Sequence, residues 1–187
     1  MGKREDKRAE IVDRLSAHFL EAGLEDISLR RLAEVAGTSD RMLLYYFSNK
    51  DDLVTAVLMR IGADLDAVLT EEFGTAPMAP DRLLRKLWAL VKSDVFAGQL
   101  RLWLELSGRA ARGDPLFMAI SRAISAGWVD RVTSLLDVPK KDRRALGILI
   151  MSAVDGQVVL FPTEPEQGNS AVAKFAEFLR AYRRGID

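Results

Sequence analysis

The sequence contains no cysteine and only one histidine, His18. Without cysteine the chain cannot form a disulfide, a thiolate zinc site or a cysteine nucleophile. A single histidine cannot make a histidine-rich metal site, and a Ser-His-Asp triad would have to be built around it. His18 lies among Ile11, Leu15 and Phe19 in a helical pattern, which is typical of a core or boundary position. We therefore expect no enzyme activity, no cofactor and no metal site.

The sequence also lacks long apolar runs and an excess of one charge. Its longest apolar stretches are interrupted by Ser152, Asp155 and Gln157, so no membrane span of about 18 residues is present. The N-terminus is charged and leads into no apolar segment typical of a signal peptide, so we expect a cytoplasmic protein. With 27 basic and 27 acidic side chains the net charge is zero. Any affinity for nucleic acid must therefore come from a local patch.

The composition is that of a globular protein, with 49% apolar and 29% charged residues over 187 positions. Nearly every segment shows the 3.6-residue period of a helix, and none shows sustained alternation typical of a strand. We therefore predict an all-α fold. Glycine, proline and capping residues divide the chain into nine expected helices, at about 4–23, 28–36, 40–47, 51–72, 81–96, 99–111, 115–137, 141–161 and 169–184.

Residues 28–50 have the pattern of two short helices joined by a tight turn. Ser28 and Ser39 are suited to cap the two helices, and Gly37 can take the left-handed conformation between them. Leu43 and Phe47, four residues apart, would bury the second helix against the first. The residues then left to point outward are Asp40, Arg41, Met42, Leu44 and Tyr45. This arrangement is typical of a helix-turn-helix whose second helix enters the major groove of DNA.

The same segment resembles the N-terminal DNA-binding region of the TetR family of regulators. The resemblance is carried by Ser28, Ala33, Ala36-Gly37-Thr38-Ser39, Leu43, Tyr46-Phe47 and Asn49-Lys50-Asp51-Asp52-Leu53. It covers about residues 8–60, and beyond them only the number and lengths of the helices agree. It implies a three-helix DNA-binding domain at residues 1–50. It also implies a helical bundle for ligand binding and dimerisation at residues 51–187, with the helix at 51–72 as connector.

The resemblance further implies which side chains contact DNA. Ser28 and Lys50 would hold backbone phosphates, with Tyr46 also near the backbone. The residues placed near base edges or flanking phosphates are Arg30, Asp40, Arg41, Met42 and Tyr45. Ser39 is also expected to be a DNA-binding residue. Lysine and hydroxyl groups suit phosphate, arginine can bind guanine bidentately, and tyrosine or methionine can touch thymine methyls. Leu44 and Asp40 depart from the family, which often has tyrosine and lysine there.

An alternative is that Tyr45-Tyr46-Phe47 is only core and that the charges form a solvated face. Residues 28–50 hold four basic side chains (Arg30, Arg31, Arg41, Lys50) and two acidic ones (Glu34, Asp40), a net charge of +2. Four more basic residues precede them, Lys3, Arg4, Lys7 and Arg8, but Glu5, Asp6 and Glu10 offset most of that charge. We expect salt-sensitive DNA binding of ordinary strength.

The helix at 141–161 combines small and apolar residues at helical spacing. Small residues allow a partner helix to approach closely, and the resemblance implies a four-helix interface across a two-fold axis with the last helix. The expected interface residues are Ala145, Ile148, Leu149, Ser152, Ala153, Gly156, Val159, Leu160, Phe175 and Leu179. The alternative is that these residues face the core of their own chain.

Large apolar side chains are spread over four consecutive helices of the second half. They are Trp88, Phe96, Trp103, Phe117, Met118, Trp128 and Met151. Aromatic residues at helical spacing are usually core, whereas the resemblance implies that such residues line an effector pocket. A ligand that favours one arrangement of the two DNA-binding domains of a dimer would shift the dimer between a state that can bind DNA and one that cannot.

The leading prediction is a repressor that binds a palindromic DNA operator as a homodimer and is released by a small hydrophobic effector. The alternative is an architectural or chromosome-organising protein of the same fold, which binds DNA but has no effector. A filled core and cooperative spreading on DNA would favour this alternative. An enzyme on a helical scaffold would need a pocket with converging titratable groups.

Overall fold

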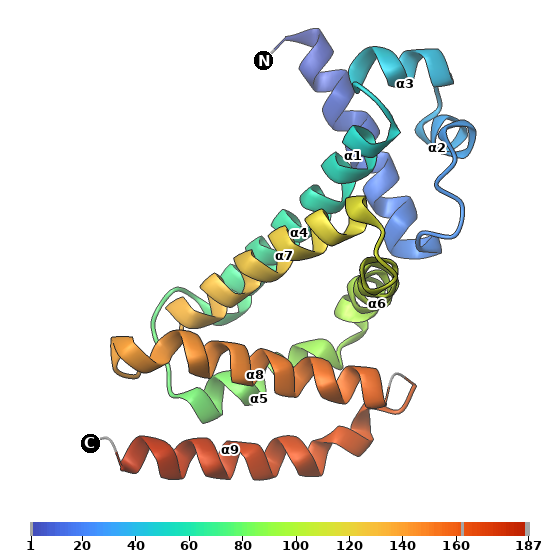
Figure 1. Cartoon of the computed structure of the whole chain (residues 1–187). Coiled ribbons are helices and arrows are strands. Elements are labelled where there is room, and N and C mark those ends of the chain that lie inside the picture. The colour runs from blue at the N-terminus through green and yellow to red at the C-terminus, as the bar shows by residue number, and fades with distance from the viewer. Residues whose placement is uncertain (1, 162, 186–187) are drawn as a thin grey trace. The chain divides into compact units, whose positions relative to one another are not determined.

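The computed structural model describes residues 2–161 and 163–185, which contain nine α-helices and no β-strand (Figure 1). The helices are α1 (Lys3–Ala22), α2 (Leu29–Ala36), α3 (Asp40–Tyr46), α4 (Lys50–Phe73), α5 (Pro80–Val91), α6 (Ala97–Ala111), α7 (Pro115–Ser134), α8 (Lys140–Leu160) and α9 (Asn169–Arg184). Two short 3-10 helices, η1 (Asp94–Phe96) and η2 (Pro165–Gly168), precede α6 and α9. The all-α prediction is confirmed. Within the described ranges, no helix has the length and apolar character needed to cross a membrane.

Local sequence signals account for several helix starts. Pro115 is the first residue of α7, where its missing N–H removes no intrahelical hydrogen bond. The Asp114 carboxylate accepts hydrogen bonds from the backbone N–H groups of Leu116 at 3.0 Å and Phe117 at 3.4 Å. The expected start of this helix at residue 115 is therefore confirmed. α5 likewise has a proline, Pro80, as its first residue, but no side chain caps it.

Two helices are shorter than expected, and the first is the one predicted at 81–96. α5 ends at Val91 because the chain turns there. The carbonyl of Leu90 accepts two hydrogen bonds from Ser93, one from its hydroxyl at 2.6 Å and one from its backbone N–H at 2.9 Å. This side-chain bond to the backbone competes with helix continuation, and η1 follows.

The helix predicted at 115–137 also ends early, at Ser134. The backbone groups beyond it bond to a distant segment instead. The N–H of Met78 donates to the carbonyl of Leu135 at 2.8 Å, and the N–H of Asp137 donates to the carbonyl of Met78 at 2.9 Å. These long-range bonds satisfy polar groups that a longer helix would have used.

The chain forms two compact units, and each combines two segments of the sequence. Unit 1 contains residues 1–65 and 98–124, and unit 2 contains residues 66–97 and 125–187. The boundaries fall inside α4, after the first residue of α6, and inside α7. The expected boundary at residue 50 separates a DNA-binding domain from a ligand-binding and dimerisation domain by function, and it stays a prediction.

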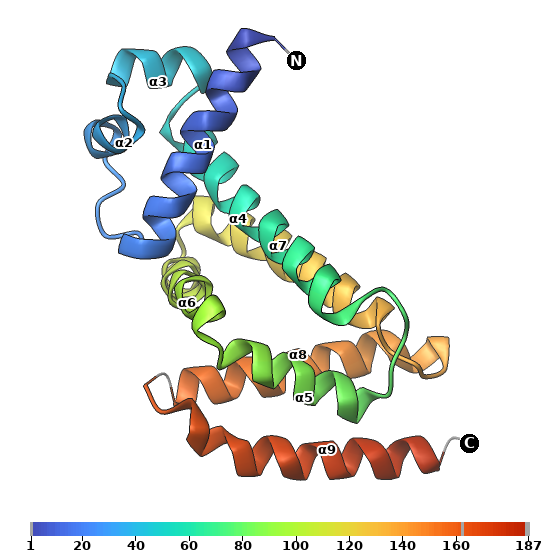
Figure 2. The same ribbon diagram turned by 180° about the vertical axis from the view of Figure 1, so that it is seen from behind.

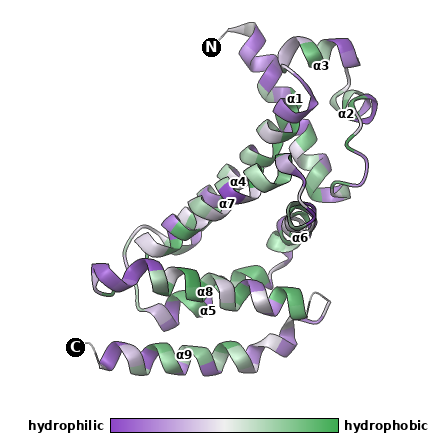
Figure 3. Ribbon diagram, viewed as in Figure 1, coloured by the Kyte–Doolittle hydropathy of each residue, from purple (hydrophilic) through white to green (hydrophobic). Residues whose placement is uncertain are grey.

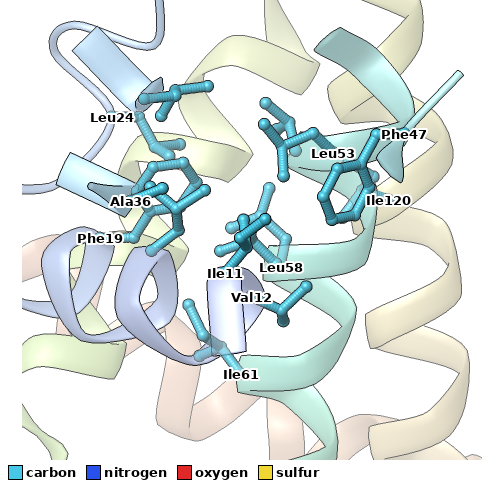
Figure 4. Close-up of a cluster of buried hydrophobic side chains, with 14 of the residues drawn as sticks. Ile11, Val12, Phe19, Leu24, Ala36, Phe47, Leu53, Leu58, Ile61 and Ile120 are labelled. Atoms are coloured by element: carbon cyan, nitrogen blue, oxygen red, sulfur yellow. The ribbon is translucent and has the colours of Figure 1, made fainter. Parts of the chain in front are cut away.

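The core of unit 1 lies between its N-terminal helices (Figure 2 and Figure 4). α1 places Ile11, Leu15 and Phe19 on one face, with at most 1% of each exposed. This confirms the apolar face expected for the first helix. His18 is half-buried beside it, which is a boundary position. The rest of unit 1 contributes Leu32, Leu43, Phe47, Leu53, Leu58, Leu106, Phe117 and Ile120.

In unit 2, α9 packs along α5. Each helix buries one apolar face, and Figure 3 shows the mixture of polar and apolar residues expected of such amphipathic helices. The buried residues are Leu83, Leu84 and Leu87 of α5 with Val172, Ala176 and Leu179 of α9. The indole N–H of Trp88 donates to the Asn169 side-chain oxygen at 2.7 Å, which fixes the start of α9 on α5.

Candidate nucleic-acid interface

The turn between α2 and α3 has the geometry expected from the sequence. The Ser28 hydroxyl caps α2 by accepting a backbone N–H bond at 3.3 Å. Gly37 ends α2 in the left-handed region, with φ of +66°. The N–H of Thr38 then donates back to the carbonyl of Ala33 at 3.0 Å. The predicted cap and the predicted glycine turn are therefore confirmed.

α1 confines this turn from the side. The guanidinium of Arg14 donates to the carbonyl of Ala36 at 3.2 Å, so it satisfies a carbonyl at the end of α2. A Cβ atom added to Gly37 would lie 2.8 Å from Arg14 Nη1. The Arg14 side chain can shift to make room, so it is the left-handed backbone conformation that favours glycine at position 37.

α3 buries one face and exposes the other. The Ser39 hydroxyl caps the helix by accepting from the N–H of Met42 at 3.3 Å. Leu43 on α3 and Phe47 directly after it are 0% and 2% exposed, as expected for the buried side of this segment. On the opposite face the exposed large apolar side chains are Met42 (38%), Leu44 (49%) and Tyr45 (57%). The outward face predicted for this helix is therefore confirmed.

Asp40, which departs from the resembled family, has a structural reason for its position. It lies in the first turn of α3. A carboxylate there interacts favourably with the partial positive charge of the helix N-terminus. The next residue, Arg41, is exposed, and no ion pair is found for it among the residues that the structure describes. Arg41 can therefore meet a ligand without first breaking a salt bridge.

The start of α4 presents Lys50 in a similar way. The Asn49 side-chain oxygen accepts from the N–H of Asp52 at 2.8 Å, and the Asp52 carboxylate accepts from the N–H of Ser48 at 2.9 Å. These reciprocal bonds define the first turn and leave Lys50 exposed at its beginning. A lysine beside free backbone N–H groups at a helix N-terminus is suited to bind phosphate.

The basic residues of α2 are more strongly engaged within the chain. Arg30 and Arg31 both pair with Glu34, at 3.4 Å and 3.6 Å. Asp26 accepts hydrogen bonds from the Ser28 side chain and backbone, which lowers the pKa of its carboxyl. This carboxylate beside Ser28 opposes a phosphate contact there. Exposed ion pairs contribute little free energy, so Arg30 can still exchange Glu34 for another anion.

The expected DNA contacts all lie within unit 1, on or beside α2, α3 and the start of α4. Ser28 and Arg30 lie at the start of α2, Lys50 lies at the start of α4, and α3 or its cap carries the rest, namely Ser39, Asp40, Arg41, Met42, Tyr45 and Tyr46. All are exposed except Tyr46, which is half-buried. Its ring meets the ring of Tyr45 edge to face, with centroids 5.1 Å apart. Contact of these residues with DNA stays a prediction.

Sequence reasoning missed two contacts made by the first turns of α1. Arg4 donates a hydrogen bond to the carbonyl of Tyr45 at 3.1 Å, and its guanidinium carbon lies 5.1 Å from the centre of the Tyr45 ring. Arg8 lies over the Phe47 ring at 4.6 Å. Arg4 and Arg8 are four residues apart, which signals a shared helix face, but nothing local indicates what that face contacts.

Sequence reasoning also missed a polar clamp that α6 places on the end of α1. Arg101, Glu105 and Arg109 follow one another at four-residue spacing on one face of α6. The two arginines donate to backbone carbonyls at the end of α1 and in the following loop, and the Glu105 carboxylate accepts from the N–H of Leu24 at 2.6 Å. The four-residue spacing of these charged side chains is visible in the sequence, but the sequence does not show that they contact the end of α1.

The residues expected to line an effector pocket are distributed over both units. In unit 1, Phe117 is in the core, Trp103 packs against it, and Met118 is 42% exposed. In unit 2, the rings of Phe96 and Trp128 meet at 6.4 Å. Trp88 borders an open groove of about 360 Å³ between α5 and α9. The remaining residue, Met151, is half-buried on α8. An effector pocket formed by this set stays a prediction.

Most residues expected in a dimer interface lie on an accessible face of α8. The large ones are Ile148 (44% exposed), Leu149 (54%), Val159 (64%) and Leu160 (67%). Ala145 and Ser152 are also exposed, and Ala153, Gly156 and Phe175 are half-buried. Leu179 differs, because it is 3% exposed within the core of unit 2. Sequence reasoning missed Phe178 (63%) and Tyr182 (40%), which are exposed on α9.

Comparisons with known proteins agree with this geometry. Residues 11–57 match the model of the bacterial regulatory proteins of the tetR family. The HTH-type transcriptional regulator BetI of Burkholderia mallei is 32% identical over 106 residues, which is 56% of this chain and 54% of the relative. The match thus spans only about half the length of this curated relative.

Solved structures extend the likeness of fold to nearly the whole chain. A TetR-family regulator from Cytophaga hutchinsonii matches with a TM-score of 0.77 at 14% identity, covering 97% of this chain and 96% of that one. A regulator from Saccharomonospora viridis, solved in complex with choline, matches with a TM-score of 0.70 at 17% identity, covering 92% and 96%. Residues 11–57 thus match the tetR family of bacterial regulatory proteins, and the fold of nearly the whole chain resembles that of TetR-family regulators.

Proposed function

We propose that the protein represses transcription by binding a palindromic DNA operator as a homodimer, and that a small effector releases it. The observation that carries this proposal is the exposed face of α3, where Arg41, Met42 and Tyr45 are free of the core. Arginine at such a position can donate two hydrogen bonds to guanine, and the apolar side chains can contact thymine methyls. Lys50 at the start of α4 adds a phosphate contact that sets the register of the helix on the duplex.

A homodimer is supported by the apolar face of α8. Leu149, Val159 and Leu160 are each more than half exposed, and Phe178 adds a further exposed ring on α9. Large exposed apolar side chains on consecutive helices mark interaction surfaces in soluble proteins. A two-fold symmetric pairing would bury the same face on both protomers and would present two copies of α3 to one operator.

The effector is proposed to be a small organic molecule with a largely apolar surface. The neighbouring fold from Saccharomonospora viridis was solved with choline, and the multidrug binding protein EbrR was solved with proflavin. Large apolar side chains in the second half of this chain, such as Phe96 and Trp128, support an apolar pocket. Choline and proflavin are therefore the first two probes for release of the protein from DNA.

The DNA-binding proposal is tested by fluorescence anisotropy on the DNA upstream of the protein's own gene. Arg41→Ala should reduce the preference for this DNA over a random duplex. Lys50→Ala should weaken both and lower the salt-dependence slope by about 0.9. Lys141→Ala is the matched control, because Lys141 is an exposed lysine in the first turn of another long helix, α8. Binding that shows no sequence preference, or that is unaffected by both variants, would contradict the proposal.

A further inference from the structure

The first turns of α1 hold the C-terminal end of α3 through two stacked arginine–aromatic contacts. The guanidinium of Arg4 lies over the ring of Tyr45, and that of Arg8 lies over the ring of Phe47, at 5.1 Å and 4.6 Å from the ring centres. Both views of the fold show the start of α1 beside α3 (Figure 1 and Figure 2). The two aromatic residues differ in role, because Phe47 is buried whereas Tyr45 is 57% exposed.

Arg4 makes two different contacts with the same residue. Besides lying over the ring, it donates a hydrogen bond to the backbone carbonyl of Tyr45 at 3.1 Å. This carbonyl is among the last four of α3, which have no partner within the helix. A cation at a helix C-terminus also interacts favourably with the helix dipole. Arg4 therefore stabilises both the last turn of α3 and the side chain that this turn carries.

The Tyr45 ring is consequently held by two contacts although it is exposed. Arg4 lies over it, and the Tyr46 ring packs against it edge to face at a centroid distance of 5.1 Å. An exposed side chain normally loses rotamer freedom when it is immobilised at an interface. A ring that is already held in the free protein loses less, and it meets its target in a defined orientation.

We propose that Arg4 is a positioning residue for DNA recognition, which fixes Tyr45 in the orientation that reads the operator. The inference rests on the proposed function and adds a specificity-determining role outside the helix-turn-helix. Its chemical requirement is a planar guanidinium, because lysine can supply the charge but neither the stacking plane nor the fork of donors. Lys7 lies in the same segment but pairs with Glu10 of its own helix at 2.8 Å, so it has no such role.

The test compares operator binding with binding to a random duplex of equal length over a range of salt concentrations. Arg4→Ala should weaken operator binding roughly 3- to 10-fold, the effect of freeing one interfacial side chain, and should leave random-duplex binding and the salt slope nearly unchanged. Arg4→Lys should behave like Arg4→Ala, and Lys7→Ala should behave like wild type. In a Tyr45→Ala background, Arg4→Ala should have no further effect.

Two outcomes would overturn the inference. Equal losses on both duplexes together with a slope lowered by about 0.9 would show that Arg4 neutralises a phosphate directly. Full binding by Arg4→Lys, or additive effects of the Arg4 and Tyr45 variants, would show that the stacked contact is not what matters.

A measurement without DNA separates this inference from the proposed function. Amide hydrogen exchange across α3 should be faster in Arg4→Ala than in wild type or Lys7→Ala, because the last turn loses its bond to Arg4. If wild type binds no DNA but exchange still accelerates, the proposed function fails while the positioning contact stands. If exchange is unchanged in Arg4→Ala, the positioning role is refuted, whatever the result with DNA.

Discussion

Replacing Gly23 by alanine should destabilise the protein strongly, through two separable effects at the end of α1. Gly23 has φ of +75° and ψ of −154°, a region that is open essentially to glycine alone. A Cβ atom at this position would also collide with the Glu105 carboxylate, lying 2.8 Å from its Oε2 atom. That same oxygen accepts the hydrogen bond from the N–H of Leu24 at 2.6 Å.

The expected magnitude is the sum of these two effects. Backbone strain for a non-glycine residue in this region is about 1–3 kcal/mol. Displacing the Glu105 carboxylate would leave the N–H of Leu24 without its acceptor, which adds about 1–3 kcal/mol. Gly23→Ala should therefore lower the free energy of unfolding by about 2–6 kcal/mol, measured by urea denaturation at one fixed protein concentration.

A double-mutant cycle tests this reasoning directly. Glu105→Ala removes both the acceptor and the collision, so Gly23→Ala in that background should show only the backbone strain of about 1–3 kcal/mol. The two substitutions together should thus destabilise less than the sum of their separate effects. Additive effects, or a loss below about 1 kcal/mol for Gly23→Ala alone, would refute the account of this junction.

Three further predictions follow from other parts of the structure. Gly37→Ala should destabilise the protein by about 1–2 kcal/mol in thermal or urea unfolding because Gly37 has a positive φ. Gly127→Ala is the control, because Gly127 is exposed on α7 with open space around it, and this change should be neutral or stabilising. Equal effects of the two substitutions would contradict this prediction. Leu149→Glu should dissociate the proposed homodimer in analytical ultracentrifugation with helicity retained, whereas Val95→Glu, at a 71% exposed position, should not. A dimer unaffected by Leu149→Glu would exclude this face. Burial raises the pKa of Asp155, so its contribution to stability is present below the unfolded pKa and is lost as the pH rises through the raised folded pKa. Asp155→Asn should therefore reduce the fall in unfolding free energy between about pH 4 and pH 7 in urea titrations, and an unchanged pH dependence would count against it.

The parts of the fold that depend on neighbouring residues could be predicted from the sequence. Ser28, Gly37 and Ser39 act on backbone groups within a few residues of themselves, so their roles as caps and turn follow from composition and spacing. The apolar spacing of Leu43 and Phe47 likewise determines which face of α3 is buried. The exposed face of the candidate interface was therefore predictable.

The parts that depend on distant residues were not predictable. Arg4 and Tyr45 are 41 positions apart, and Glu105 and Leu24 are 81 apart, so no local period connects either pair. The end of α7 could not be predicted for the same reason, because the carbonyl of Leu135 accepts a hydrogen bond from the N–H of Met78 and not from its own helix. Apolar spacing also cannot distinguish a buried position from an interface, as the burial of Leu179 shows.

Selection of bound duplexes from a pool of random sequences tests whether α3 recognises operator DNA in a two-fold symmetric dimer. We expect wild type to enrich an inverted repeat whose half-sites lie about one helical turn, roughly 10 base pairs, or a multiple of it apart. Arg41→Ala should change the bases selected in each half-site. Selection of no common sequence, or of the same sequence by wild type and Arg41→Ala, would contradict recognition of DNA by α3.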